Sequence, residues 1–261
     1  MTLRSTIGAV RRRTLCSVHR RFVPLGNRGP IVSFCFDDFP RTAYTVGGSV
    51  LRNFGARGTY YGAIGYMYQS ENLHERVTAE DLRLLVKDGH ELANHTFSHV
   101  SSRALPLAAF REDVLKGQEA ICEITGGVPP ANFAYPFGEV TLAAKKALGS
   151  EMASCRGIYG GVNGPQLDLN LLRANSLYGD DDRLVVVEHL VSENSKQKGW
   201  LIFYTHDVSQ TPSSFGCTPS LLESAVSCAV RYGARISTVA AVLSDLRAAN
   251  PNALTGLPAT E

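Results

Sequence analysis

Three segments of the sequence place polar side chains directly after a run of apolar residues. They are Ser33-Phe34-Cys35-Phe36-Asp37-Asp38, His95-Thr96-Phe97-Ser98-His99 after the run His90 to Ala93, and Trp200-Leu201-Ile202-Phe203-Tyr204-Thr205-His206-Asp207. Carboxylates and imidazoles are the side chains that bind metal ions and transfer protons near neutral pH. These segments therefore carry the candidate chemistry of the protein.

His95 and His99 have the spacing of a metal-binding pair. Two residues four positions apart share one face of a helical turn, with Cβ atoms about 5–6 Å apart, so both imidazoles can reach one ion. A third ligand must come from another segment, and Asp37 or Asp38 at a second strand end is the natural donor. Successive strand residues face opposite ways, so both carboxylates enter one site only if the turn at Phe39-Pro40 redirects the chain.

The combined set of side chains predicts a hydrolase. Two imidazoles and one carboxylate fill three positions around a metal such as zinc and leave a fourth position open for water. The second carboxylate remains to accept a proton, and His206 remains to donate one to a leaving group. These are the groups that hydrolysis of an amide or an ester requires.

Strand-like and helix-like segments alternate along most of the chain. The strand-like runs are Ile31 to Phe36, Gly58 to Gly62, His90 to Ala93, Asn132 to Ala134, Met152 to Ser154, Trp200 to Tyr204 and Ala234 to Ile236. The helix-like stretches are Ala43 to Phe54, Thr78 to Asp88, Leu107 to Ile124, Val140 to Leu148, Arg183 to Asn194, Pro219 to Tyr232 and Thr238 to Ala249. This alternation predicts an α/β fold, a distorted (β/α) barrel with about seven parallel strands, whose active site lies where the strands end. Segment 157–182 is the least regular, and we expect a long surface loop there.

Basic residues are concentrated at the start of the chain. Residues 1–30 contain seven arginines and no acid, which leaves 19 of the 26 Lys and Arg against all 24 Asp and Glu in the remainder. We expect a basic N-terminal arm over 1–30, one barrel domain over 31–250 and a C-terminal tail over 251–261. The arm favours an anionic membrane surface as a partner, and we expect no nucleic acid partner. Because every candidate catalytic group lies beyond the arm, we expect the arm to be dispensable for chemistry.

The composition is that of a globular protein. Apolar residues make up 44% and charged residues 19% of the 261, and no apolar run approaches the ~20 residues of a membrane-spanning helix. The start of the chain lacks the ~7–15-residue apolar stretch of a secretory signal. The six cysteines form no C-x-x-C pair and are typical of reduced thiols. We therefore expect a cytoplasmic protein, held at the membrane wherever its basic arm binds lipid; the sequence does not set its oligomeric state.

The order and spacing of the motifs resemble those of the polysaccharide deacetylases of carbohydrate esterase family 4, which share the nodulation-factor deacetylase homology domain. The resemblance spans roughly Ile31 to Leu246 and rests on Phe36-Asp37-Asp38, His95-Thr96-Phe97-Ser98-His99, Phe133-Ala134-Tyr135-Pro136-Phe137-Gly138 and Tyr204-Thr205-His206. It implies that one divalent metal, with zinc preferred, is held by Asp38, His95 and His99. It also implies that Asp37 is the general base, that His206 is the general acid and that the backbone N–H of Phe137 belongs to the oxyanion hole. The implied reaction removes N-acetyl groups from an amino-sugar-containing poly- or oligosaccharide or its biosynthetic precursor.

The motifs depart from the family pattern beside the base and beside the acid. Phe39-Pro40 replaces the usual Gly-Pro, and Ala134 stands where many members carry an arginine that orients the base. We expect Arg173, which follows the apolar run Leu169 to Leu172, to supply the missing guanidinium. The fourth motif, with its Asp-Trp pair, has no clear counterpart, so His206 lacks an evident carboxylate partner. We expect the sugar to be bound by Phe39, Tyr135, Pro136 and Phe137.

Other functions fit parts of the pattern. An O-acetyl esterase or a cyclic-amide hydrolase on the same fold would use the same groups. A catalytically silent sugar-binding relative would be favoured by the loss of Asp37 or His206, and both are present. Two histidines and a carboxylate also describe the iron site of non-haem oxygenases, but those stand on antiparallel double-sheet barrels, which the strand-helix alternation disfavours.

Overall fold

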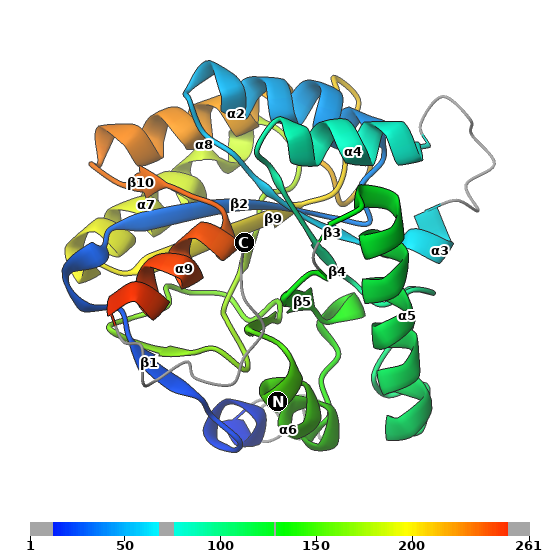
Figure 1. Ribbon diagram of the computed structural model, residues 1–261. Helices are drawn as coiled ribbons and strands as arrows, with labels where there is room; N and C mark the ends of the chain where they lie inside the picture. Colours follow the sequence, from blue (N-terminus) through cyan, green and yellow to red (C-terminus); the bar gives the residue numbers. More distant parts are fainter. Residues whose placement is uncertain (1–12, 68–75, 128, 250–261) are drawn as a thin grey trace, which may run out of the picture.

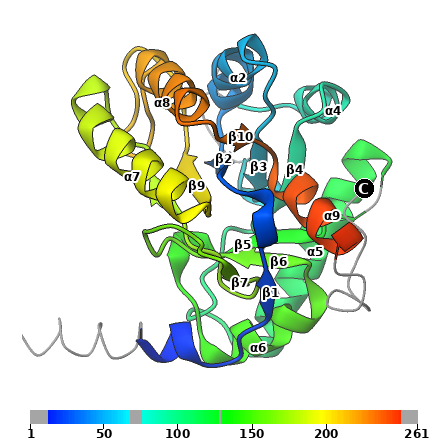
Figure 2. The same cartoon turned by 90° about the vertical axis from the view of Figure 1, so that its left-hand side faces the viewer.

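A curled sheet of parallel strands forms the centre of the computed structural model, and helices cover its outside (Figures 1 and 2). The structure describes residues 13–67, 76–127 and 129–249. The first twelve residues of the predicted arm and the predicted tail over 251–261 lie outside the described residues.

The strands run along the sheet in the order β6-β5-β4-β3-β2-β9-β8, with β10 paired to β2. Their bounds are β2 (Ile31–Asp37), β3 (Thr59–Gly62), β4 (Glu91–Asn94), β5 (Asn132–Ala134), β6 (Ser154–Arg156), β8 (Asn175–Ser176), β9 (Trp200–Thr205) and β10 (Arg235–Ile236). Every pairing in this sheet is parallel. Leu172 also bridges to Arg156, so the segment that leads into β8 links the two edges. The predicted distorted barrel with about seven parallel strands is therefore confirmed.

The helices follow the predicted pattern closely. They are α2 (Ser49–Asn53), α3 (Ile64–Met67), α4 (Ala79–Lys87), α5 (Leu107–Thr125), α6 (Leu142–Glu151), α7 (Leu184–Gln197), α8 (Pro219–Arg231) and α9 (Val239–Ala249). Thr78 begins α4 with a full capping box that includes Asp81, and Gly126 ends α5 in the left-handed conformation. None of the helices in the described ranges is long and apolar enough to cross a membrane.

Alternation along β2 and β9 separates the barrel interior from the helical layer. Phe34 and Phe203 pack with one another in the cluster that includes the helices α2 and α8, whereas Cys35, Ile202 and Tyr204 belong to a second cluster. Since side chains alternate along a strand, Asp37 and His206 continue the second set. The alternation of side chains along β2 and β9 thus directs Asp37 and His206 to the mouth of the barrel.

The segment predicted to be a long surface loop, 157–182, is instead part of the fold. It contains β7 (Gln166–Asp168) and β8, and its leucines at 167, 169, 172 and 177 are buried. The prediction missed them because these strands have only two or three residues, too short to show a period.

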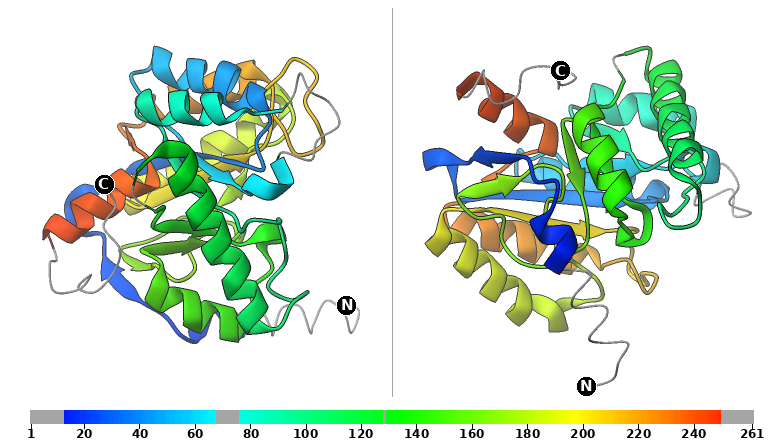
Figure 3. Two further views of the ribbon diagram at one scale, coloured as in Figure 1. Left: turned by 45° about the vertical axis from the view of Figure 1, so that its right-hand side comes forward. Right: turned by 90° about the horizontal axis from the view of Figure 1, so that it is seen from below.

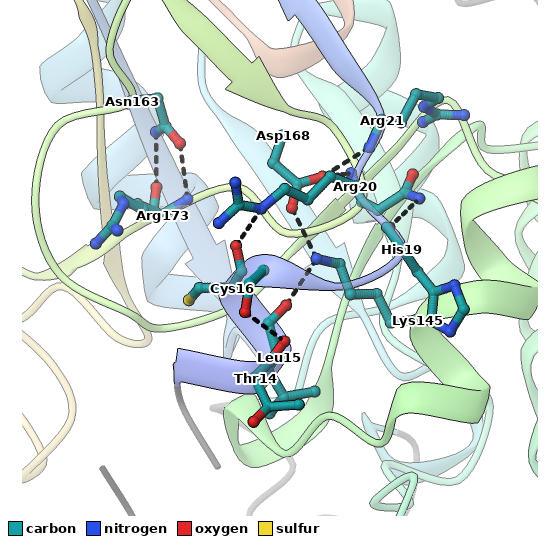
Figure 4. Close-up of polar contacts among 12 residues, drawn as sticks. Thr14, Leu15, Cys16, His19, Arg20, Arg21, Lys145, Asn163, Asp168 and Arg173 are labelled. Atoms are coloured by element: carbon teal, nitrogen blue, oxygen red, sulfur yellow. Dashed lines mark hydrogen bonds and ion pairs between the residues drawn. The ribbon is translucent and has the colours of Figure 1, made fainter. Parts of the chain in front are cut away.

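The described half of the predicted basic arm packs on the barrel. Residues 13–17 are helical, β1 (Phe22–Pro24) pairs antiparallel with β7, and Leu15 and Val23 are buried. Figure 3 shows this segment running beside α6. The fully buried Lys145 donates from Nζ to the carbonyl of Leu15 at 2.8 Å and to Asp168 at 2.7 Å (Figure 4). The guanidinium of Arg21 donates to backbone carbonyls at the end of α6.

Candidate active site

A cavity of about 1190 Å³ opens at the carboxyl ends of the strands. This is the end at which parallel barrels carry their catalytic groups, because the strands converge there and the following loops are free to vary. The cavity is lined by the five candidate catalytic and metal-binding side chains, Asp37, Asp38, His95, His99 and His206, and by Tyr66, Tyr135, Phe137, Tyr178 and Phe215 among others. Three segments predicted from strand ends therefore meet in one place.

The two aspartates at the end of β2 both reach the site because Asp38 adopts a left-handed backbone conformation. Asp37 is the last residue of β2 and continues its interior face. Asp38 has a positive φ of 44°, an uncommon conformation that Asp tolerates better than most residues, and its N–H donates to the carbonyl of Tyr61. The left-handed residue turns the second carboxylate toward the same cavity, as the prediction required.

The two histidines come from an irregular loop after β4 rather than from the predicted helical turn. Thr96 and His99 have φ values of 65° and 53°, and the imidazole centroids nevertheless lie 5.1 Å apart. Asp113 on α5 holds the loop by accepting hydrogen bonds from the N–H groups of Phe97 and Ser98 at 3.0 Å.

α5 can approach this loop closely because residue 117 is a glycine. A Cβ there would lie 2.9 Å from the carbonyl carbon of Thr96 and 2.6 Å from Oδ1 of Asn94. The missing side chain thus lets the helix support the histidine loop directly.

Asp38, His95 and His99 form a cluster whose donor atoms all lie within 4.8 Å of one another. Asp38 Oδ2 is 2.7 Å from His99 Nε2 and 3.7 Å from His95 Nε2, while Asp38 Oδ1 is buried without a hydrogen-bond partner among the described residues. His95 Nδ1 lies 2.7 Å from the carbonyl of Ala134, which fixes the ring so that Nε2 faces the cluster. The donor set and its orientation fit a divalent metal ion.

The ionisation of this cluster also suits a metal. Burial alone would raise the pKa of Asp38, but its electrostatic interaction with His95 and its hydrogen bond with His99 outweigh burial and lower it. Burial lowers the pKa of His95, although Asp38 and Asp37 oppose the shift. A carboxylate and a neutral imidazole are the forms that coordinate metal ions.

Arg156 holds Asp37, the candidate base. Both side chains are buried, and Nη2 of Arg156 lies 2.6 Å from each carboxylate oxygen. The guanidinium also lies over the ring of Tyr61 at 4.7 Å and over that of Tyr204 at 5.2 Å. Burial would lower the pKa of Arg156, but the interaction with Asp37 reverses this shift and raises the pKa, so the guanidinium stays charged.

The guanidinium predicted at Arg173 is therefore supplied by Arg156. Arg173 donates from Nη1 to the carbonyl of Gly160 and does not reach Asp37. Ala134, where family members often carry arginine, is the direct neighbour of Arg156 in the register of β5 and β6. In this chain the guanidinium therefore comes from the strand next to β5. The sequence did contain a signal for Arg156, because it is a polar residue just beyond the predicted strand end at Ser154.

The predicted sugar-binding residues separate into two groups. Phe39 is buried against Tyr60 at 5.1 Å between ring centroids, and it does not line the cavity; Pro136 is buried as well. Tyr135 contributes a buried part of the cavity wall. Phe137 has a positive φ of 58°, is 61% exposed and lies 4.4 Å from His99 between ring centroids. Phe39 is excluded from the wall because its ring completes the core instead of facing the site.

His206 stands on the opposite wall, at the end of β9. Its ring stacks on Tyr178, with centroids 6.1 Å apart, and meets Phe215 edge to face at 5.4 Å. The adjacent carboxylate, Asp207, accepts a hydrogen bond from the N–H of Ser213 at 2.9 Å. A candidate proton donor and a candidate carboxylate base thus line the same cavity as a cluster that can hold a metal, which is an arrangement suited to hydrolysis.

Known proteins share both the motifs and the fold. The family model for polysaccharide deacetylase matches residues 26–152, which include Asp37, Asp38, His95, His99 and the turn at Phe137. The uncharacterized protein YlxY of Bacillus subtilis (strain 168) is 37% identical over 73 residues, which are 26% of this chain and 23% of that protein. The chain thus matches less than a quarter of the length of this curated relative.

Several solved structures superpose over most of the chain. A mutant of the peptidoglycan deacetylase PdaC from Bacillus subtilis has 15% identity and a TM-score of 0.53, covering 86% of this chain and 95% of that one. A family 4 acetyl xylan esterase from Clostridium thermocellum, in complex with a cobalt ion, has 18% identity and a TM-score of 0.54, covering 88% and 93%. A mutant of a CE4 family pseudoenzyme has 13% identity and a TM-score of 0.54, covering 83% and 68%.

At these identities the solved structures establish the fold alone. The matched region holds the aspartate pair, the histidine pair and the turn after β5 in family order, and the strands that carry them form the same barrel. Over residues 26–152 the chain matches the polysaccharide deacetylase family, and its barrel resembles the solved structures named above.

Proposed function

We propose that the protein is a metal-dependent hydrolase that removes N-acetyl groups from amino sugars in a poly- or oligosaccharide or in its biosynthetic precursor. One observation carries the proposal: the Asp38, His95 and His99 cluster shares a cavity with the Asp37–Arg156 pair and with His206. The match of residues 26–152 to the polysaccharide deacetylase family model supports deacetylation as the reaction.

The metal is proposed to be a single divalent ion held by Asp38, His95 and His99. Nitrogen and oxygen donors in a three-residue set favour zinc among the common candidates and leave an open position. When bound, such an ion would polarise the acetyl carbonyl and make a water molecule more acidic.

The side chains around the cluster have complementary tasks. Asp37, oriented by its hydrogen bonds with Arg156, accepts the proton of the attacking water. His206 donates a proton to the nitrogen of the departing amino sugar, which is a poor leaving group without it. The backbone N–H of Phe137 is proposed to stabilise the negative charge that develops on the acetyl oxygen.

The walls of the cavity fit a carbohydrate. The rings of Tyr66 and Phe137 are each at least half exposed and line the cavity, so they offer apolar faces for stacking on sugar rings. The residues that line it include no lysine or arginine in the described part of the chain. An acetylated carbohydrate is therefore the proposed substrate.

Acetate release tests the proposal directly. Purified protein is assayed on N-acetylglucosamine oligomers, O-acetylated xylan, and nucleotide-linked or lipid-linked N-acetylated sugars, with and without a chelator followed by added zinc. We expect chelator-sensitive release from an N-acetylated substrate, and loss of release in Asp37→Asn with metal content unchanged. Release from the O-acetyl substrate alone would instead favour an esterase, and sugar binding without any release would favour a silent relative.

The cellular setting is proposed from the sequence alone. We propose a cytoplasmic protein whose Arg-rich start contacts anionic lipid, because seven arginines and no acid occur in residues 1–30. Sedimentation with phosphatidylserine-containing vesicles, compared with neutral vesicles, measures this contact. A chain that starts at Gly29 lacks all seven arginines and should lose the preference for anionic vesicles; an unchanged preference would remove the arm from membrane binding.

A further inference from the structure

The wall that carries His206 is aromatic. Tyr178 lies nearly parallel to the imidazole, with an interplanar angle of 21°, and Phe215 stands almost perpendicular to it, at 84°. The two aromatic rings also contact each other edge to face, at 5.8 Å between centroids. Two rings of different orientation therefore restrict the tilt of the imidazole more than either ring alone.

The backbone around Tyr178 is fixed on both sides. Tyr178 follows β8, the strand next to β9 in the sheet. The N–H of Leu177 donates to the carbonyl of Tyr204, and the N–H of Gly179 donates to the carbonyl of Gly216, both at 2.8 Å. The stacking ring is thus tied to the strand and to the loop that flank His206.

Phe215 is attached to the same point. Its carbonyl accepts hydrogen bonds from the N–H of His206 at 3.0 Å and from the hydroxyl of Thr205 at 3.3 Å. The loop between them is closed by Asp207, whose carboxylate accepts from the N–H and the hydroxyl of Ser213. The carboxylate nearest to His206 in sequence is therefore committed to holding the Phe215 loop.

Tyr178 also connects the acid to the opposite side of the site. Its hydroxyl is hydrogen-bonded with that of Tyr204, whose ring lies 5.2 Å from the guanidinium carbon of Arg156. Burial and this hydrogen bond raise the pKa of Tyr178, so the hydroxyl stays neutral. Contacts thus run without a break from Asp37 through Arg156, Tyr204 and Tyr178 to His206.

We propose that Tyr178 and Phe215 are the positioning residues of His206, performing with ring contacts what a carboxylate partner would perform with a hydrogen bond. The inference rests on the proposed function, since it takes His206 as the proton donor. The two rings fix the plane of the imidazole, because one lies nearly parallel to it and the other nearly perpendicular. Loss of a ring should therefore impair the transfer of a proton to the leaving group more than the binding of the sugar.

The test compares two substrates that differ in their need for that proton. The amine that leaves an N-acetylglucosamine oligomer must be protonated, whereas the nitrophenolate that leaves 4-nitrophenyl acetate need not be. We expect Tyr178→Leu to lower kcat on the oligomer about 10- to 100-fold, with KM changed less than about 3-fold, and to leave the ester rate within about 3-fold. Tyr178→Phe keeps the ring and should keep most of the activity on the oligomer.

A double-mutant cycle and NMR complete the design. In the His206→Ala background, Tyr178→Leu should lower kcat on the oligomer little further, because the imidazole that Tyr178 positions is already absent. Phe215→Leu, a change at a ring that is 57% exposed, provides a second variant should Tyr178→Leu fold poorly, and it should show the same selectivity for the amide substrate. Equal losses on both substrates, or full additivity with His206→Ala, would overturn the inference.

The NMR signal of His206 separates this inference from the proposed function. The ring currents of Tyr178 and Phe215 should displace the chemical shifts of the His206 ring protons, and Tyr178→Leu should return these shifts toward ordinary values. A wild-type protein that releases no acetate from any substrate would refute the proposed function. Undisplaced His206 signals in the wild type would refute the positioning role whether or not acetate is released.

Discussion

Replacing Arg156 by methionine tests the electrostatic centre of the site. The substitution keeps most of the apolar volume but leaves the carboxylate of Asp37, which is 4% exposed, without its counter-charge. Breaking a buried ion pair from one side costs about 3–5 kcal/mol, because a buried charge remains uncompensated. The contacts with Tyr61 and Tyr204 are lost as well. We therefore expect the free energy of unfolding to fall by about 3–5 kcal/mol.

Turnover should fall for a related reason. Hydrogen bonds between charged groups contribute about 1.5–3 kcal/mol, so a base that is no longer oriented should lose roughly 10- to 150-fold in kcat. Arg156→Lys keeps the charge but loses the planar group between the two tyrosines, and it should fall between the methionine variant and the wild type. Urea unfolding and acetate release measure the two effects separately.

The matched control is Arg173→Met, at the arginine that was predicted from sequence to orient the base. It removes the same side chain at a position that does not contact Asp37, so stability should change by about 0.5 kcal/mol or less and turnover should be retained. Adding Asp37→Asn to Arg156→Met removes the uncompensated charge and should recover stability without recovering turnover. Wild-type behaviour of Arg156→Met, or equal damage from Arg173→Met, would refute the assignment.

Three further predictions concern the metal, pH and the N-terminal segment. His99→Ala should abolish bound divalent metal by elemental analysis, whereas Ser98→Ala should retain it; metal in both variants at wild-type occupancy would contradict the cluster. Burial lowers the pKa of His90 to about 4 in the folded protein, whereas the same side chain in the unfolded chain has a pKa of about 6.5. Between these two pH values the unfolded chain binds one more proton than the folded protein. Stability should therefore decrease as pH falls from about 6.5 to about 4, by at most roughly 3 kcal/mol, and His90→Gln should flatten this dependence in urea unfolding; an equally steep dependence in that variant would point to other groups. A chain starting at Gly29 loses β1 and the Leu15 partner of Lys145, so its melting temperature should fall by several degrees, whereas a chain starting at Arg13 should match the full chain; equal stability of the two truncated chains would show that the packed segment contributes nothing.

The local patterns of the sequence were sufficient for the barrel and for the three polar strand ends. Apolar runs of four to seven residues and the capping box at Thr78 are decided within a few residues of the chain, so the main strands and helices could be predicted close to their observed bounds. The converging strand ends follow from the parallel alternation, which brings Asp37, Asp38, His95, His99 and His206 to one cavity.

Only the tertiary structure decided which side chains support these groups. Asp37 and Arg156 are 119 positions apart, and their contact exists because β5 places β6 at the register that sets Arg156 beside Ala134. In the same way, the burial of Phe39, the stacking of Tyr178 on His206 and the pairing of β1 with β7 depend on neighbours distant in sequence. A local pattern identifies a strand and the residue at its end, but packing between strands selects the partner of that residue.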